Sequence, residues 1–181
     1  DERRRFAQVS HEYLIEQVQE QSMTASGNQN LNFNHPVKEL IWVNKDAVAK
    51  SQGTTTIATN TKTDVLGSGT TTYQLKLNGH DRFAARDFKY FTRTQVWQHH
   101  TGSMGLDLTS TTTGFCDSIA VYSFALKPEE HQPSGTCNFS RIDNAQLCSS
   151  IDWNPKGLYI YAVNYNVLRI MSGMGGLAYS N

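Results

Sequence analysis

The segment SIAVYSFALKPEEHQPSGTCNFSRID, residues 118–143, decides the fold class of this chain. Ile119 to Leu126 is a run of apolar and β-favouring residues about as long as an ordinary strand. Pro128 ends this run because proline has no N–H to donate to a strand ladder. Pro133-Ser134-Gly135 is typical of a turn. The alternation from Thr136 to Asp143 then predicts a second strand, with Cys137, Phe139 and Arg141 on one face.

Further runs on either side of this segment also predict strands. Tyr73–Asn78 alternates, with Tyr73, Leu75 and Leu77 pointing inward. Val37–Asn44 is apolar on both faces, so we expect both faces to be covered. His11–Glu20 fits either a short helix or a strand, and its periodicity does not decide between them. The last strand, Gly157–Met171, places on one face Leu158, Ile160, Ala162, Asn164, Asn166, Leu168 and Ile170.

Polar segments separate these runs. We expect a polar loop at Ser22–Asn30, a Thr-rich surface loop at 45–72, a further loop at 101–114 and a turn-rich stretch at Asn144–Pro155. One helix is predicted over Arg82–Thr92, where aromatic residues alternate with charged ones and Asp81 precedes as a cap. The pattern therefore predicts an all-β chain, an antiparallel β-sandwich with one or two short helices. We favour a jelly roll, and the pattern does not separate it from an immunoglobulin-like sandwich.

The totals limit the classes of function. The 181 residues fit one domain, and 16 basic residues balance 16 acidic ones, which argues against a protein that coats nucleic acid. The cysteines Cys116, Cys137 and Cys148 lack the spacing of metal ligands, so we expect buried structural thiols in a reducing compartment. No run approaches the roughly 20 apolar residues of a membrane span. The opening Asp1-Glu2-Arg3-Arg4-Arg5 has no signal peptide or initiator methionine, and we expect a processed or partial chain.

A metal or catalytic site is not predicted. Cupin jelly rolls bind metal through an H-x-H pair followed by Glu, whereas His99 and His100 are adjacent and would point to opposite faces of a strand. The remaining histidines are expected at loop and strand ends and are His11, His35, His80 and His131. We therefore predict no catalytic, cofactor-binding or metal-binding residues and no cofactor.

Four other motifs could imitate a site. His80-Asp81 resembles part of a triad, but the sequence has no G-x-S-x-G elbow. Glu129-Glu130 is more simply a solvated pair on a turn. Asn138-Phe139-Ser140 matches the N-glycosylation sequon, yet it lies in a predicted strand and is interpreted as a chance match. Arg3-Arg4-Arg5 is interpreted as a solvated run in preference to a phosphate-binding arm.

Several quoted motifs together resemble the major capsid protein of nucleocytoplasmic large DNA viruses, in particular its phycodnavirus and chlorovirus branch. The most specific are Tyr122 to Glu130, with YSFALKPEE, and Gln132 to Arg141, with QPSGTCNFSR. Further matches are RRRFAQ at residues 3–8, HEYLIEQV at 11–18, LNFNHPVKEL at 31–40, LNGHDRF at 77–83, YF at 90–91 and YNVLRIMSG at 165–173. The resemblance covers nearly the whole chain apart from the Thr-rich loop.

The resemblance implies a structural protein and not an enzyme. Family members have two consecutive jelly rolls, form trimers of pseudo-hexagonal outline and tile an icosahedral shell. The chain is accordingly expected to comprise an inter-domain linker remnant at 1–10 and the C-terminal jelly roll at 11–181, without the N-terminal jelly roll. Expected partners are its own copies in a homotrimer, neighbouring capsomers and minor capsid proteins, with no direct nucleic-acid contact and no membrane insertion. The expected location is the virion, after assembly in the host cytoplasm.

Two further expectations go with this resemblance. Trp42, Trp97 and the tyrosines of the last strand are expected to fill the core, and the loop at 45–72 is expected to face outward. The alternative function is a carbohydrate-binding jelly-roll module used in attachment, which needs aromatic residues beside Asn or Asp in its loops. The loops at 45–72 and 101–114 contain almost none. A cupin-type metalloenzyme is disfavoured by the histidine spacing.

Overall fold

The computed structural model describes residues 1–23, 26–44, 66, 70–102, 104–105, 117–152 and 158–180. Its helical elements are α1 (Glu2–Gln8), the π-helical turn η2 (Tyr90–Thr94), α3 (Gln95–His99) and the 3-10 turn η3 (Phe139–Arg141). Its strands are β1 (His11–Ser22), β2 (Ser26–Leu31), β3 (Pro36–Asn44), β4 (Thr72–Leu77), β5 (His80–Asp81), β6 (Arg86–Asp87), β7 (Ile119–Ser123), β8 (Cys137–Asn138), β9 (Ala145–Asp152), β10 (Leu158–Met171) and β11 (Met174–Leu177).

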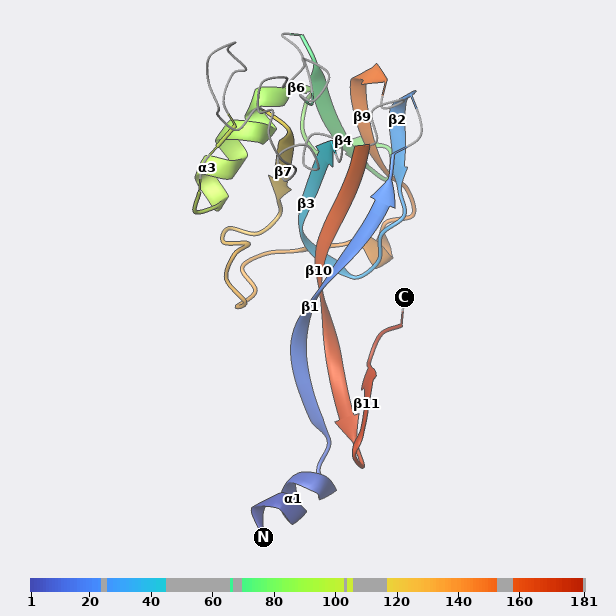
Figure 1. The fold of residues 1–181 in the computed structure, drawn as a ribbon. Coiled ribbons are helices and arrows are strands. Elements are labelled where there is room, and N and C mark those ends of the chain that lie inside the picture. The colour runs from blue at the N-terminus through green and yellow to red at the C-terminus, as the bar shows by residue number, and fades with distance from the viewer. Residues whose placement is uncertain are drawn as a thin grey trace, which may run out of the picture.

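The described strands form two sheets (Figure 1). The six-stranded sheet, here called the long sheet, has the order β1-β10-β3-β7, with β11 beside β10 and β8 beside β3. The five-stranded short sheet has the order β2-β9-β4-β5, with β6 beside β4. All pairings between the described strands are antiparallel.

The strand pairing is nested. β1 pairs with β10, β2 with β9, β3 with β7 and β4 with β5, as in one long hairpin folded over on itself. The first and third of these pairs lie in the long sheet, and the second and fourth lie in the short sheet. The two sheets therefore face each other across one core. This arrangement is a jelly roll and confirms the predicted fold class.

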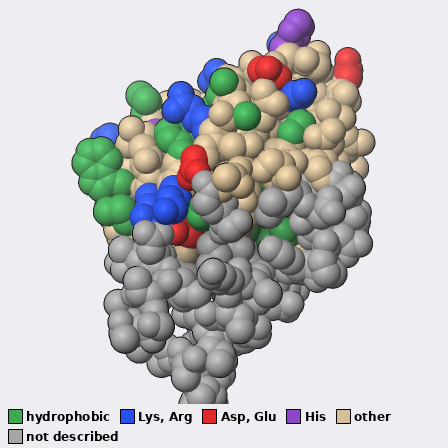
Figure 2. All heavy atoms as spheres, turned by 90° about the horizontal axis from the view of Figure 1, so that it is seen from above, with side chains coloured by type: hydrophobic (Ala, Val, Ile, Leu, Met, Phe, Trp, Pro, Cys, Tyr) green, Lys and Arg blue, Asp and Glu red, His purple; other side chains and the backbone are tan. Residues whose placement is uncertain are grey.

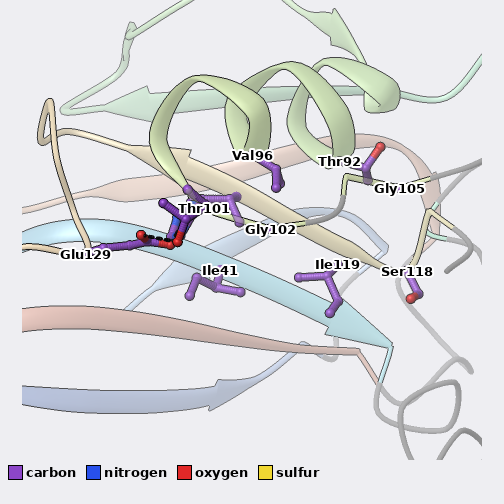
Figure 3. Close-up of a pocket in the computed structure, with 11 residues that line it drawn as sticks. Ile41, Thr92, Val96, Thr101, Gly102, Gly105, Ser118, Ile119 and Glu129 are labelled. Carbon is purple, nitrogen blue, oxygen red and sulfur yellow. Dashed lines mark hydrogen bonds and ion pairs between the residues drawn. The ribbon is translucent and has the colours of Figure 1, made fainter.

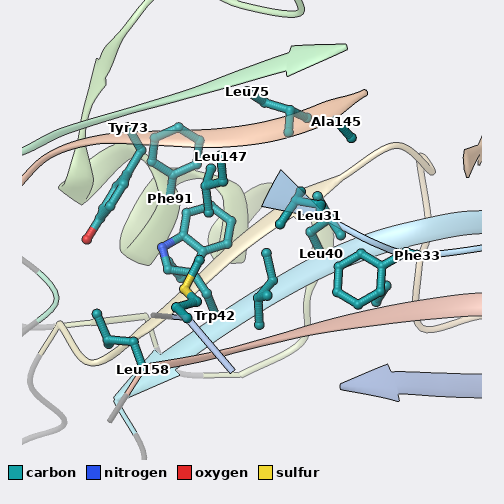
Figure 4. Close-up of a cluster of buried hydrophobic side chains, with 14 of the residues drawn as sticks. Leu31, Phe33, Leu40, Trp42, Tyr73, Leu75, Phe91, Ala145, Leu147 and Leu158 are labelled. Carbon is teal, nitrogen blue, oxygen red and sulfur yellow. The ribbon is translucent and has the colours of Figure 1, made fainter. Parts of the chain in front are cut away.

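The core between the sheets is built around three aromatic rings (Figure 4). The ring of Trp42 lies 5.5 Å from that of Tyr73 and 5.3 Å from that of Phe91. Aliphatic side chains from both sheets surround them, including Leu40, Leu75, Leu147, Leu158 and Ile160. The prediction of Trp42 as a core residue is confirmed. The prediction of Trp97 is wrong, because its side chain on α3 is 71% exposed. The tyrosines of the last strand were also expected in the core, but Tyr159 and Tyr161 are only half-buried.

Three strand predictions are confirmed and two loops are corrected. β10 and β4 match the predicted alternating strands, and β3 lies where a strand was predicted. Both of its faces were expected to be covered, but Ile41 and Val43 on the face away from the core are only half-buried. The ambiguous segment His11–Glu20 is a strand, because all of β1 pairs with β10. The segments expected as a polar loop and as a turn-rich stretch contain β2 and β9, which pair with each other. Partner strands outweigh the low β-propensity of their Asn, Gln and Ser residues.

The predicted strand from Thr136 to Asp143 is largely wrong. Only Cys137–Asn138 pairs with β3, and the chain then turns into η3. The side-chain oxygen of Asn138 accepts a hydrogen bond from the Ser140 N–H at 3.1 Å. Such local side-chain bonding offers the backbone an alternative to a strand ladder.

The predicted helix begins later than expected. It was placed at Arg82–Thr92, but Arg86 and Asp87 still pair with β4, and the helical segment runs from residue 88 to residue 99. The carboxylate of Asp87, and not that of Asp81, accepts the Lys89 N–H at 2.8 Å at the helix start. The helix therefore begins only after the residues that pair with β4.

One end of the long sheet projects beyond the short sheet as a ribbon (Figure 1). We use the name projecting ribbon for residues 11–15, residues 166–171 and β11, which are held together by strand pairing. α1 lies at its tip, in the segment expected as a linker remnant, and all its residues are exposed. The first residues of the chain thus lie far from the core.

Candidate assembly surfaces

The face of the long sheet that points away from the core carries mostly apolar side chains on β10, β3 and β7 and mostly polar ones on β1. Residues that pair directly across neighbouring strands share a face of the sheet. One such pair, Trp42 and Ile160, points into the core, so the residues next to them along each strand point outward. A large contiguous apolar surface on a soluble domain marks a contact site. The paired side chains on this outer face include Val18, Ile41, Val43, Ile119, Val121, Tyr159, Tyr161 and Val163.

A groove of about 430 Å³ lies on this outer face beside the helix (Figure 3). Ile41 and Ile119 come from the strands, and Thr92 and Val96 come from the helical segment. The polar rim is formed by His100, Thr101, Ser118 and Glu129. The groove therefore has an apolar lining and a hydrogen-bonding edge.

His100 bridges two carboxylates at the edge of the groove. Its Nε2 lies 2.9 Å from Glu39 Oε2 on β3, and its Nδ1 lies 3.2 Å from Glu129 Oε1 in the loop after β7. Glu129 also accepts hydrogen bonds from the N–H and the hydroxyl of Thr101, both at 2.8 Å. The two carboxylates lie on opposite sides of the imidazole, so this arrangement is a hydrogen-bonded bridge and not a chelate.

The bridge shifts the protonation of its members. The hydrogen bond to Glu39 raises the pKa of His100 above its usual value, burial opposes this change, and the charges of Glu39 and Glu129 reinforce it. Hydrogen bonds from the Thr101 backbone and hydroxyl lower the pKa of Glu129, and His100 adds to this effect. Both shifts favour the charged forms of the pair.

The helical segment covers the edge of the long sheet at β7. The amide oxygen of Gln95 accepts the Ser123 N–H at 3.1 Å, which satisfies a backbone donor on an edge strand. Asp117, just before β7, accepts hydrogen bonds from the Thr92 hydroxyl at 2.7 Å and from Arg93 Nη2 at 2.6 Å. These contacts hold the helix, and with it one wall of the groove, in place.

A buried lysine also lies on the outer face of the long sheet. Lys38 Nζ is 2.7 Å from Glu16 Oε1, and its side chain is 3% exposed. The same Glu16 oxygen lies 3.4 Å from His131 Nδ1. A buried lysine needs such a partner, and the ion pair links β3 to β1 across β10.

The projecting ribbon also exposes apolar side chains. A narrow ribbon of two or three strands is marginally stable in water, so its apolar residues need a covering surface. On the ribbon itself an ion pair joins Arg169 Nη2 and Glu12 Oε1 at 2.7 Å, and the His11 ring stacks on Phe6 with centroids 3.7 Å apart. Its exposed apolar residues, with those of the adjoining termini, are Phe6, Val9, Tyr13, Leu14, Met171, Met174, Leu177 and Tyr179.

The opposite end of the molecule presents a mixed surface. Seen from above, apolar side chains stand among Lys, Arg, Asp and Glu side chains, with no separation into one apolar and one charged field in the described residues (Figure 2). The described side chains at this end therefore do not form one continuous apolar patch in this view.

Most of the histidines that the sequence offers as metal ligands lie apart from one another in the structure. The Nδ1 atom of His99 lies 3.1 Å from the carbonyl oxygen of Leu126, whereas His100 binds carboxylates. His80 and Asp81 form the exposed strand β5. Among the described residues no three His, Cys, Asp or Glu side chains gather as metal ligands. The bridge of Glu39, His100 and Glu129 was not predicted, although an acidic residue inside the apolar strand β3 is a signal of it.

The remaining motifs behave as local structure. Asn138 is exposed, but its side chain caps η3. Cys137 and Cys148 are free and half-buried, and burial raises the pKa of both thiols, which makes them less reactive. Cys116, Trp153 and most of the Thr-rich loop lie outside the described residues.

The fold defines the chain as a jelly roll with exposed apolar side chains on its outer face and on the projecting ribbon. A family model described as large eukaryotic DNA virus major capsid protein matches residues 2–176. The chain therefore belongs to the family of major capsid proteins of large eukaryotic DNA viruses. Proteins of this family are structural proteins and not enzymes, so the chain is a structural protein.

Individual relatives agree with this assignment. The chain is 52% identical over 198 residues to the major capsid protein of Pyramimonas orientalis virus, matching 100% of this chain and 46% of the relative. It is 43% identical over 234 residues to that of Paramecium bursaria Chlorella virus 1, matching 99% of this chain and 51% of the relative. The chain thus spans about half the length of the curated relatives it matches.

Solved structures of capsid proteins share the fold. The quasi-atomic model of the PBCV-1 virus capsid aligns with a TM-score of 0.69 and 39% identity, covering 99% of this chain and 54% of that one. The Faustovirus major capsid protein aligns with a TM-score of 0.52 over 87% of this chain and 33% of that one. At 14% identity the second match concerns the fold alone.

Proposed function

We propose that the chain is part of a capsid subunit that forms homotrimers of pseudo-hexagonal outline, and that these capsomers tile an icosahedral shell. Residues 11–181 act as the C-terminal jelly roll of a double jelly roll, and residues 1–10 act as the linker from the N-terminal jelly roll. The observation that carries the proposal is the outer face of the long sheet, where Val18 and Ile119 are exposed and Ile41, Tyr161 and Val163 are only half-buried. The relatives' additional length supports a second domain.

The proposed partners follow from the same surfaces. They are other copies of the chain in the trimer, neighbouring capsomers and minor capsid proteins. A formal net charge of zero disfavours direct nucleic-acid contact as a main task. Among the described residues no helix is long and apolar enough to cross a membrane, and we propose no membrane insertion. The proposed place of action is the virion, after assembly in the host cytoplasm.

The test is the mass in solution of the protein expressed from its complete reading frame. Light scattering should give three times the mass of the single chain, because the outer face needs a partner. Val18→Asp places a charge on the exposed part of that face and should dissociate the trimer. Gln74→Asp, on the outer face of the short sheet, is the matched control and should remain trimeric.

A monomer with micromolar binding on a glycan array would contradict the capsid proposal and support the carbohydrate-binding module. A trimer in which Val18→Asp changes nothing would leave the capsid role standing but would place the contact elsewhere. The two results thus separate the function from the surface assigned to it.

A further inference from the structure

His100 has a hydrogen-bond acceptor on each of its two ring nitrogens. Glu39 faces Nε2 and Glu129 faces Nδ1, at 2.9 and 3.2 Å. A carboxylate only accepts, so both bonds form only if both nitrogens carry a proton. A neutral imidazole has one N–H and one lone pair and satisfies one carboxylate at most. The geometry therefore corresponds to a positively charged His100.

Loss of one proton should break the bond to Glu129 and not the bond to Glu39. The side chain of Glu39 is 7% exposed, while that of Glu129 is 39% exposed. Leaving a buried carboxylate without a donor costs far more than returning a partly exposed one to water. The remaining proton consequently stays on Nε2, and the lone pair of Nδ1 then faces the charge of Glu129.

Glu129 belongs to a closed surface loop, residues 126–134, which we call the bridge loop. Its ends meet where the Lys127 N–H donates to the Ser134 hydroxyl at 3.0 Å. Glu129 attaches this loop to the body through His100 and through the two hydrogen bonds from Thr101. The other attachments are the buried ring of Pro128, the contact between His99 and the Leu126 carbonyl, and the ion pair between His131 and Glu16. The loop is thus a small unit whose docking depends on few contacts.

We propose that His100 is a proton-controlled latch that docks the bridge loop on the body when its imidazole is doubly protonated and loosens the loop when one proton leaves. Glu39 on β3 and Glu129 on the loop face the imidazole directly. The other charged groups of the loop do not face the imidazole: Lys127 pairs with Glu130 inside the loop at 3.1 Å, and His131 pairs with Glu16 of β1 at 3.4 Å.

The direction of the switch follows from the bridge. Because the bond to Glu39 raises the pKa of His100, the latch is closed below the ordinary histidine value of about 6.5 and opens as the pH rises through the raised pKa. One side of the groove changes with it, since Glu129 lies on the rim. A mildly acidic compartment would therefore close this edge, and an alkaline one would open it.

The experiment combines a histidine titration with amide hydrogen exchange. NMR of the purified chain should show His100 titrating above about pH 6.5. After correction for intrinsic rates, amides of the bridge loop should exchange about fivefold or more faster at about pH 9 than at about pH 6, relative to amides of β10. Titration of His100 at or below the ordinary value would overturn the proposal.

Variants separate the latch from a general softening of the protein. Glu129→Gln removes an exposed charge and should leave the fold intact, lower the titration midpoint of His100 and abolish the pH dependence of loop exchange. His131→Gln is the matched control on the same loop, because its ion pair with Glu16 is largely exposed and contributes little. It should keep the pH dependence of the unmodified chain. Amide exchange in the bridge loop that stays pH-dependent in Glu129→Gln would also contradict the latch.

Discussion

Trp42 carries more of the stability than any exposed aromatic residue. Its side chain is completely buried against Tyr73 and Phe91. Trp42→Ala should lower the free energy of unfolding by about 3–5 kcal/mol, because it removes a large contact area and leaves a cavity. Denaturant unfolding measures this change. Trp97→Ala removes the same side chain from an exposed site and should change the free energy by less than about 0.5 kcal/mol; equal losses would contradict the core assignment.

Gly135 shows how one missing Cβ atom shapes a loop. Its φ is +144°, and an added Cβ would lie 2.7 Å from the Phe124 carbonyl oxygen, which is part of the backbone and has little room to move. Gly135→Ala should therefore cost about 1–3 kcal/mol of unfolding free energy. Gly176→Ala, with open space around its Cβ position, is the control. Equal thermal midpoints of the two variants would show that the loop adapts.

The helical segment acts mainly as a cover for an edge strand. Gln95 is buried, accepts the Ser123 N–H, and donates to the Tyr90 hydroxyl at 2.9 Å. Gln95→Ala leaves these groups without a partner and should destabilise the chain by about 1–3 kcal/mol. Gln98→Ala changes the same residue type on the exposed face of the helix and should be nearly neutral. Urea unfolding of both variants tests whether the edge contact matters.

The long sheet is held at its other edge by glutamine side chains. Gln19 Nε2 donates to the Asn34 carbonyl at 2.7 Å, and its Oε1 accepts the Asn34 N–H at 3.0 Å. Gln21 forms the corresponding pair with Asn30 and Asn32 at 2.6 and 2.9 Å. The segment between β2 and β3 does not pair with β1 as a strand. Its backbone N–H and C=O groups are instead hydrogen-bonded by the glutamine side chains of β1.

Across the protein, stability should depend on pH through the His100 bridge. The contribution of His100 is present below about pH 6.5 and is lost as the pH rises through its raised pKa. The contribution of Glu129 has the opposite sign: it is present above the ordinary carboxyl value and is lost as the pH falls through its lowered pKa. Thermal midpoints should therefore fall between about pH 6.5 and 9. His131→Gln should show the same fall, and a midpoint that rises over this range would refute it.

Sequence pattern was sufficient where one strand carries its own signal. β10 and β4 alternate clearly, and β3 is apolar on both faces, so each was predicted within a few residues. Local alternation reports burial of one face and needs no knowledge of the partner strand. The specific residues of 118–143 likewise led to the family, which the match over residues 2–176 confirms.

Pairing across the fold decided the rest. β2 and β9 have few apolar residues and are strands because they pair with each other, and the helix starts at residue 88 because Arg86 and Asp87 are still paired. Trp97 and Trp42 are the same residue type, and only the packing places one outside and one inside. The bridge unites Glu39, His100 and Glu129, which lie 61 and 29 positions apart. Hydrogen bonds between such distant side chains depend on how the strands bring them together, so no local pattern records them.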